Sequence, residues 1–212
     1  MLARMGAALD LEPGAPASKT VEAMKELVNA RDALVKDRVA ALNRQAIVVS
    51  PLIKRQLAQR LRQINGQIEA IDKHLKMLRN ADSDLCQRFD ILTSIPGLGE
   101  ATANVLVFET PELGRLENAQ AASLVGLAPL ARDSGKTHGK RSIRGGRPRA
   151  RQALYMPALN AIRCNPEFKA KYKAMVKAGK PAKVAIVAIM RKLLILANAL
   201  IRGQRKWTPA AP

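Results

Sequence analysis

The sequence contains few aromatic residues, cysteines and histidines. Phe, Tyr and Trp together make up 3% of its 212 residues. Modules that stack single-stranded bases need exposed aromatic platforms, so the composition disfavours that mode of nucleic-acid binding. The two cysteines, Cys86 and Cys164, and the two histidines, His74 and His138, stand apart from one another without zinc-ligand spacing. We therefore predict no metal site, and two buried free thiols in a reducing cytoplasm.

Long apolar runs are also missing. The most apolar region, residues 184–201, is divided by Arg191 and Lys192, and neither half reaches the roughly 18–20 residues that span a bilayer. Residues 1–9 are too short for a signal peptide, and no cleavage site follows an apolar run. These features predict a core helix at 184–201, no membrane association and a cytoplasmic protein.

Acidic residues are scarce relative to basic ones. The chain has 36 Lys and Arg against 17 Asp and Glu, which gives a net charge of +19 at pH 7. Because 48% of the residues are hydrophobic, the chain is not a disordered basic tail. Such a charge on a folded chain points to a polyanionic partner, most often nucleic acid, bound with a steep salt dependence. The alternative is a generally basic protein without a dedicated site.

The strongest concentration of positive charge is the basic loop, residues 132–151. Four glycines leave its backbone free to lie close to a ligand, and Ser134 and Ser142 place hydroxyls among the cations. A nucleophile beside positive charge has the ingredients for attack on a phosphodiester. The alternative is a solvated basic loop that only contacts phosphates. Asp133 is its one acid, and its eight cations are candidates for phosphate contacts: Arg132, Lys136, Lys140, Arg141, Arg144, Arg147, Arg149 and Arg151.

Two long helices are predicted before this loop. The first covers residues 19–48, and Ser50 and Pro51 fit the N-cap and first position of the second. The second helix carries apolar residues at alternating spacings of four and three, which is the seam of a coiled coil: Leu57, Leu61, Ile64, Ile68, Ile71, Leu75 and Leu78. The partner is either the preceding helix, through Met24, Val28, Val35 and Leu42, or a second subunit. An amphipathic helix on a globular core is the remaining alternative.

Residues 92–103 resemble a helix-hairpin-helix element. Gly97 and Gly99 allow a sharp turn whose amides, together with the start of a helix at Glu100, can hold a phosphate oxygen without reading a base. The alternative is an ordinary corner between two helices of the core.

The sequence also predicts helices over most of the remaining chain. We predict a helix capped by Asn118, a helix over 148–163 kinked at Pro157, and helices over 166–178 and 182–202, with a short hairpin in the basic loop. The fold class is therefore mainly α: a long coiled-coil hairpin followed by a compact helical domain. The expected organisation is a linker at 1–18, the hairpin at 19–80, the compact domain at 84–207 and a tail at 208–212.

Three segments in order resemble a known family. They are Ile95-Pro-Gly-Leu-Gly99, then Gly126-Leu-Ala-Pro129 leading into Asp133-Ser-Gly135, and Gly179-Lys-Pro181 leading into Arg191-Lys-Leu-Leu194. Together they resemble the C-terminal domain of the DEDD insertion-sequence transposases, the IS-one-ten group, which includes Piv-like DNA invertases. The likeness extends over roughly residues 84–207, and residues 19–80 resemble the helical segment that the family places between its domains.

The resemblance implies a two-part active site. In this family an N-terminal resolvase-like domain holds two metal ions with four carboxylates, and a serine of the C-terminal domain becomes covalently attached to DNA. Ser134 then becomes the nucleophile, with Ser142 as runner-up, and the nearby cations hold phosphates. Some members are guided by an RNA. Residues 1–18 offer Asp10 and Glu12 but no convergent carboxylate cluster, so we expect a truncated transposase, with Mg²⁺ bound only by the missing domain.

Three functional hypotheses follow. The first is a truncated transposase that binds DNA, forms a homo-oligomer through residues 57–78 and does not cleave DNA alone, because a serine without a base or metal is a poor nucleophile. The second is a non-catalytic fragment that dimerises with full-length transposase and inhibits it. The third is a generic basic nucleic-acid-binding protein, in which replacing Ser134 changes nothing.

Overall fold

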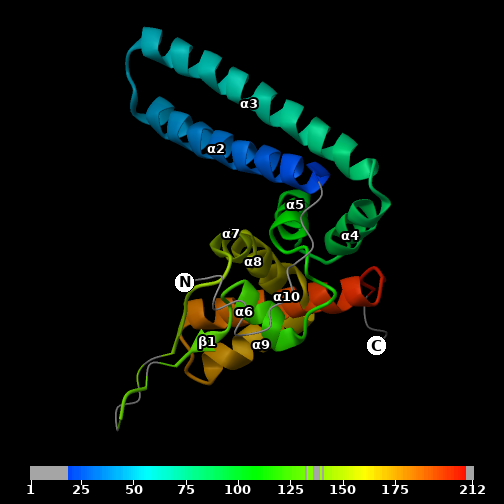
Figure 1. The fold of residues 1–212 in the computed structure, drawn as a ribbon. Coiled ribbons are helices and arrows are strands. Elements are labelled where there is room, and N and C mark those ends of the chain that lie inside the picture. Colours follow the sequence, from blue (N-terminus) through cyan, green and yellow to red (C-terminus); the bar gives the residue numbers. More distant parts are fainter. Residues whose placement is uncertain (1–18, 132, 136–138, 140, 209–212) are drawn as a thin grey trace.

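The computed structural model describes residues 19–131, 133–135, 139 and 141–208. These residues are mainly helical and include one two-stranded sheet, so the predicted mainly α class is confirmed. Figure 1 shows a long helical hairpin, formed by α2 and α3, lying across a compact group of the remaining helices that we call the body. A narrow arm, of which the structure describes residues 129–131, 133–135, 139 and 141–143, leaves the body on the side away from the hairpin.

The hairpin consists of α2 (Lys19–Ile47) and α3 (Pro51–Asn80), close to the predicted bounds. Pro51 occupies the first helical position, where its missing N–H costs no hydrogen bond. Ser50 is the N-cap residue, as predicted, although its side chain accepts no capping hydrogen bond. The helix start is exposed, and water can satisfy its first amides instead.

The predicted apolar seam of α3 faces α2 of the same chain. Leu57, Leu61, Ile64 and Leu75 are buried, and α2 packs along α3 over the hairpin. The buried positions of the seam are therefore covered within one chain. The structure thus favours the intramolecular partner that the spacing alone left open.

One residue of the partner seam was predicted wrongly. Met24 and Val28 of α2 are buried, as expected, but the side chain of Leu42 is 44% exposed. Its neighbour Ala41 is buried instead, in a small cluster with Leu57 and Leu61. A small side chain at this level leaves room for two leucines of α3, because packed interiors have little volume for a third large one.

The hairpin contacts the body at the end of α3 and along α2. At the end of α3, the Arg79 guanidinium lies 3.5 Å from the centroid of the Phe89 ring, a cation–π contact across the turn into α4 (Ser83–Thr93). Asp82 caps α4 by accepting hydrogen bonds from the amides of Asp84 and Leu85 at 3.0 and 3.1 Å. Farther along, α2 packs against α5 (Glu100–Glu109).

Helix α10 (Ala182–Arg202) is the centre of the body. It packs against α4, α6 (Asn118–Leu124), α8 (Tyr155–Cys164) and α9 (Pro166–Lys177). By length and composition α10 is apolar enough to cross a membrane, and 56% of its most apolar window is buried inside the protein. Its contacts with four helices make it a core helix of the body, as the sequence predicted.

The helix predicted over 148–163 is divided into α7 (Pro148–Ala153) and α8, with the break at Leu154. Pro157 lies in the first turn of α8 and has no N–H to donate to the carbonyl of Ala153, four residues earlier. The Thr102 hydroxyl donates to that carbonyl at 3.3 Å instead. The break therefore has the predicted cause, and α5 supplies the missing donor.

The start of α6 differs from the prediction in one detail. Glu117, not Asn118, is the N-cap, and it forms a capping box with Gln120. The loop before it is held on α10 by the buried Asn198, whose amide oxygen accepts from the Gly114 N–H and whose amide nitrogen donates to the Leu116 carbonyl, both at 2.8 Å.

Candidate nucleic-acid interface

The arm begins as the short hairpin expected in the basic loop. Strand β1 (Pro129–Leu130) pairs antiparallel with β2 (Ser142–Ile143), with Pro129 opposite Ile143. Figure 1 shows the described part of the connection between the strands extending away from the helices. Ser134 lies on this connection and is exposed. The predicted phosphate contacts Arg132, Lys136 and Lys140 lie outside the described residues.

A hydrogen bond crosses the connection beside Ser134. The amide of Gly139 donates to the Asp133 carboxylate at 3.1 Å, so the acid of the Asp-Ser-Gly step bonds to a residue of the returning segment. Ser134 therefore follows a residue that is held in place, while its own side chain faces solvent.

The base of the arm is built by close backbone contacts. Gly146 has a φ of +62°, and a Cβ there would lie 2.3 Å from the Gly126 nitrogen and 2.7 Å from the Leu124 carbonyl oxygen. Arg151 reaches the same place, because its Nη1 donates to the carbonyls of Gly145 at 2.7 Å and Val125 at 3.1 Å. The two segments that lead into and out of the arm are thus joined where they leave the body.

Arg147 is bound to protein groups rather than pointing freely into solvent. Its guanidinium donates to both carboxylate oxygens of Glu112, at 2.5 and 2.6 Å, and to the Glu109 carbonyl. The hydrogen bond from Arg147 lowers the pKa of Glu112, and the same bond raises the pKa of Arg147. A bidentate pair of this kind fixes the guanidinium in the loop after α5.

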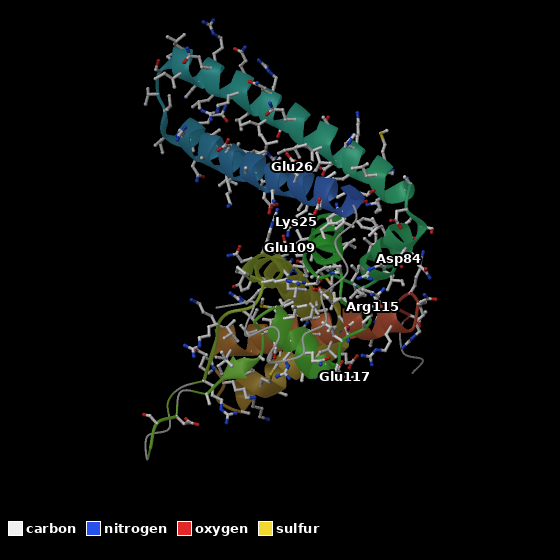
Figure 2. All side chains as sticks on the ribbon, in the orientation of Figure 1. Lys25, Glu26, Asp84, Glu109, Arg115 and Glu117 are labelled. Atoms are coloured by element: carbon white, nitrogen blue, oxygen red, sulfur yellow. The ribbon has the colours of Figure 1, made fainter. Side chains whose placement is uncertain are left out.

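Arg149 connects the body to the hairpin. Its Nε and Nη2 donate to one carboxylate oxygen of Asp32 at 2.9 and 2.7 Å, and Nη2 also donates to the Val28 carbonyl at 2.8 Å. Its Nη1 is 3.4 Å from the carboxylate of Glu109, which lies between the hairpin and the body in Figure 2. One side chain thus bridges α2, α5 and α7.

The predicted cations therefore divide into two groups. Arg147, Arg149 and Arg151 donate to protein acceptors, which leaves them fewer donors for a phosphate. Arg141 and Arg144 are exposed at the side of the arm that returns to the body. These two are the described members of the predicted set that are best placed to meet a nucleic acid.

Gly97 and Gly99 occupy the turn between α4 and α5, as expected, but they differ in surroundings. Gly97 has a φ of +93°, and a Cβ there would lie 3.1 Å from the Pro157 carbonyl oxygen, so this glycine is needed to pack the turn on α8. Gly99 is the exposed N-cap of α5, with nothing within 4 Å of an added Cβ. Of the two, Gly99 leaves backbone accessible to a phosphate.

A groove of about 520 Å³ lies beside the base of the arm and was not predicted from the sequence. Arg141 and Ser142 of the arm line one side, and Lys180, Lys183 and Arg191 line the other. Lys183, Val187 and Arg191 recur at intervals of four, which places them on one face of α10. This spacing could have indicated the basic side of the groove from the sequence alone. The apolar composition of the helix indicated a buried core position instead.

The two cysteines are free, as predicted, but the prediction that they are buried is wrong: Cys86 is half-buried, and Cys164, the last residue of α8, is exposed. Acidic, histidine and cysteine side chains do not form a cluster like that of the cations. Within the part of the chain that the structure describes, no three of them lie together in a way that could hold a metal ion. Asp10 and Glu12 lie outside the described residues. The described residues therefore do not fit the carboxylate site that the resemblance implies.

Part of the chain is similar to a known protein family. Residues 89–173 match the transposase IS116/IS110/IS902 family. The matched segment runs from α4 into α9 and includes the Gly97 turn and the whole arm. The similarity therefore covers Ser134, whereas the hairpin and α10 lie outside it.

Curated relatives extend the similarity over more of the chain. The pilin gene-inverting protein of Moraxella bovis is 31% identical over 211 residues, which cover 98% of this chain and 65% of that protein. The 43.6 kDa protein of insertion element IS110 from Streptomyces coelicolor is 27% identical over 80% of this chain and 42% of its own length. The 42 kDa protein of insertion element IS900 from Mycobacterium paratuberculosis is 33% identical over 57% of this chain and 31% of its own length.

The chain spans less than two thirds of the length of the curated relatives it matches. The chain is thus similar to this transposase family over residues 89–173, and over more of its length to a pilin gene-inverting protein and to proteins of insertion elements.

Proposed function

We propose that this chain is the DNA-binding, serine-bearing part of an insertion-sequence transposase or DNA recombinase. The observation that carries the proposal is the arm: a two-stranded stem, anchored by close backbone contacts, that presents an exposed serine away from the body. The surplus of basic residues supplies the attraction for DNA.

Ser134 is the proposed nucleophile. Its Oγ attacks the phosphorus of a phosphodiester, a Ser–O–P bond forms, and the bond from phosphorus to one bridging deoxyribose oxygen breaks. The hydroxyl proton passes to a base, and the departing oxygen takes up a proton. The cations of the arm would stabilise the charge that develops on phosphorus-bound oxygens. Ser142 is paired in β2 at the edge of the groove, so we keep it as the second candidate.

The carboxylates for Mg²⁺ are proposed to come from polypeptide outside the described residues, as the resemblance implies. The described side chains do not form a fitting site for the ion, so they are given no part in holding it. The chain by itself is then expected to bind DNA without cutting it. A guide RNA would use the same basic surface, since RNA and DNA share the phosphate backbone.

The second candidate function is a non-catalytic fragment that pairs with a full-length transposase and inhibits it. The residues that favour it are no longer the seam at 57–78 but the exposed apolar side chains around the turn of the hairpin: Val39, Leu42, Ile47, Val49, Leu52 and Ile53. A patch of this kind at the end of a hairpin is suited to contact another copy.

The test uses end-labelled DNA and a denaturing gel that detects protein–DNA adducts. With Mg²⁺ and the purified chain alone we expect binding but no adduct. With the four-carboxylate domain of a relative supplied in trans, we expect an adduct that Ser134→Ala abolishes and Ser123→Ala, a matched exposed serine on α6, does not. An adduct with the chain alone would overturn the requirement for the second part, and an adduct that survives Ser134→Ala would overturn the role of Ser134.

A further inference from the structure

The groove beside the arm is a cationic channel with an apolar floor. Arg141 stands on the arm side, and Lys180, Lys183 and Arg191 stand on the body side. No acidic residue lines it within the described part of the chain. Among the ion pairs between described residues, none involves these four cations, unlike Arg147 and Arg149. Four cations that face one groove without acidic partners leave their charge for an external anion.

The floor of the groove is apolar. Val184 is 52% exposed, an unusual position for a large apolar side chain on the central helix of the body, and Val187 and Leu127 lie beside it. An inorganic phosphate has no apolar surface to place against this floor. The sugar–phosphate backbone of a nucleic acid combines anionic groups with apolar faces. Its phosphates can contact the cations along the sides of the groove, and its sugars can contact the apolar floor.

The length of the cationic face matches several nucleotides. Lys183 and Arg191 are eight residues apart on α10, which separates them by about 12 Å along the helix axis. One strand of B-form DNA rises about 3.4 Å per nucleotide, so this distance corresponds to about three or four nucleotides. No aromatic side chain of the described residues lines the groove, so a strand held there is contacted through its backbone and not by stacking of its bases.

The groove and the arm share strand β2. Arg141, Ser142 and Ile143 line the groove and also begin the segment by which the arm returns to the body. In Figure 1, β1 is drawn next to the region where α10 starts. A strand lying in the groove is therefore contacted at once by the body and by the stem that presents Ser134.

We infer that this groove binds the sugar–phosphate backbone of the DNA strand that flanks the phosphodiester facing the arm. Lys180, Lys183, Arg191 and Arg141 contact successive phosphates, and Val184 and Val187 contact deoxyribose. The inference rests on the proposed function, because it names the part of the substrate that this chain holds next to the reacting bond. It adds α10, which lies beyond the family match, to the DNA-binding surface.

The test measures binding of the full chain to a labelled DNA duplex of about 30 base pairs between about 50 and 200 mM salt. Each lost phosphate contact lowers the slope of log Kd against log salt by about 0.9, which weakens binding about eightfold at about 0.1 M salt. Lys183→Gln combined with Arg191→Gln should thus weaken binding about 60-fold and lower the slope by about 1.8. The matched control, Lys169→Gln with Lys173→Gln on exposed positions of α9, removes the same charge from residues that do not line the groove and should change binding about twofold or less, because no phosphate contact is lost.

A second pair of variants tests the floor. Val184→Glu places a carboxylate in the groove and should weaken DNA binding at least about tenfold, whereas Val176→Glu on α9, where valine is 41% exposed, should not. Both sites are on helix surfaces, and circular dichroism verifies that each variant is folded. An equal effect of the groove and control variants, with wild-type binding intact, would overturn the groove and leave the proposed function standing.

Two further outcomes are decisive. Absence of salt-dependent DNA binding by the wild-type chain would overturn the proposed function and the groove together. Groove variants that weaken binding of an RNA of equal length while leaving DNA binding unchanged would overturn the assignment of the groove to DNA.

Discussion

The bridge made by Arg149 gives the sharpest prediction about stability. Asp32→Asn removes the charge of its partner while retaining the shape, and Arg149→Met removes the guanidinium while retaining a long side chain. Measured singly and together, the two substitutions form a double-mutant cycle that isolates the energy of the pair. Because Asp32 is on α2 and Arg149 on α7, this energy reports how firmly the hairpin is held to the body.

The expected magnitude follows from exposure and geometry. Hydrogen bonds to charged groups contribute about 1.5–3 kcal/mol when shielded, and exposed ion pairs contribute about 0.2–1 kcal/mol. The side chains of Arg149 and Asp32 are 21% and 40% exposed, so we expect a coupling energy of about 1–2 kcal/mol. Arg149→Met alone should cost about 2–4 kcal/mol, because it also removes the cation beside Glu109, whose side chain is only 13% exposed.

The assay is urea unfolding followed by far-ultraviolet circular dichroism, combined with amide hydrogen exchange of α2. The Arg31–Asp72 pair within the hairpin is the matched control, since its side chains are 23% and 43% exposed. Breaking either pair should lower the free energy of unfolding. Only the variants that break the Arg149–Asp32 pair should speed hydrogen exchange of the α2 amides without a matching change in the α3 amides. A coupling energy below about 0.3 kcal/mol would refute the reasoning, because the bridge would then contribute as little as the weakest exposed pairs.

Two further predictions concern the base of the arm. Gly146→Ala should destabilise the protein by more than about 2 kcal/mol and Gly135→Ala by only about 1–2 kcal/mol, because both have positive φ but only Gly146 lacks space for a Cβ; equal unfolding free energies would contradict this. Arg147 lowers the pKa of Glu112, so their bond stabilises the protein above the ordinary glutamate pKa of about 4.3 and is lost as the pH falls through the lowered value. The difference in unfolding free energy between wild type and Glu112→Gln should therefore be constant from neutral pH to near the ordinary pKa and shrink below it, and a difference that shrinks well above it would count against the pair.

Much of the fold followed from periodicity and from helix-ending residues. The four-and-three spacing on α3 predicted the buried side of a helix, and Pro51 and Pro157 predicted where helices begin or break. The spacing did not identify the partner helix, and it did not predict that Ala41 rather than Leu42 is buried against α3. Those depend on how closely two particular helices approach, which is a property of both surfaces together.

The site was less predictable for a related reason. A cluster of cations in the sequence gives their charge but not their partners, and Arg147, Arg149 and Arg151 find partners far away along the chain, at Glu112, Asp32 and Val125. Conversely, Lys183 and Arg191 belong to an apolar helix, and only the packing of the arm beside α10 brings them together with Arg141. The roles of Ser134 and of the exposed cations stay predictions.

The position of α10 has a consequence for synthesis of the protein. Every helix that α10 packs against precedes it in the chain, so the body cannot close before residues 182–202 have left the ribosome. The hairpin is complete at Asn80, and translation at about 5–20 residues per second places about 6–24 s between these two events. During that interval the apolar side of α3 has α2 beside it while the body has no centre, so the early pairing of the two long helices protects the nascent chain from association with its neighbours on the same message.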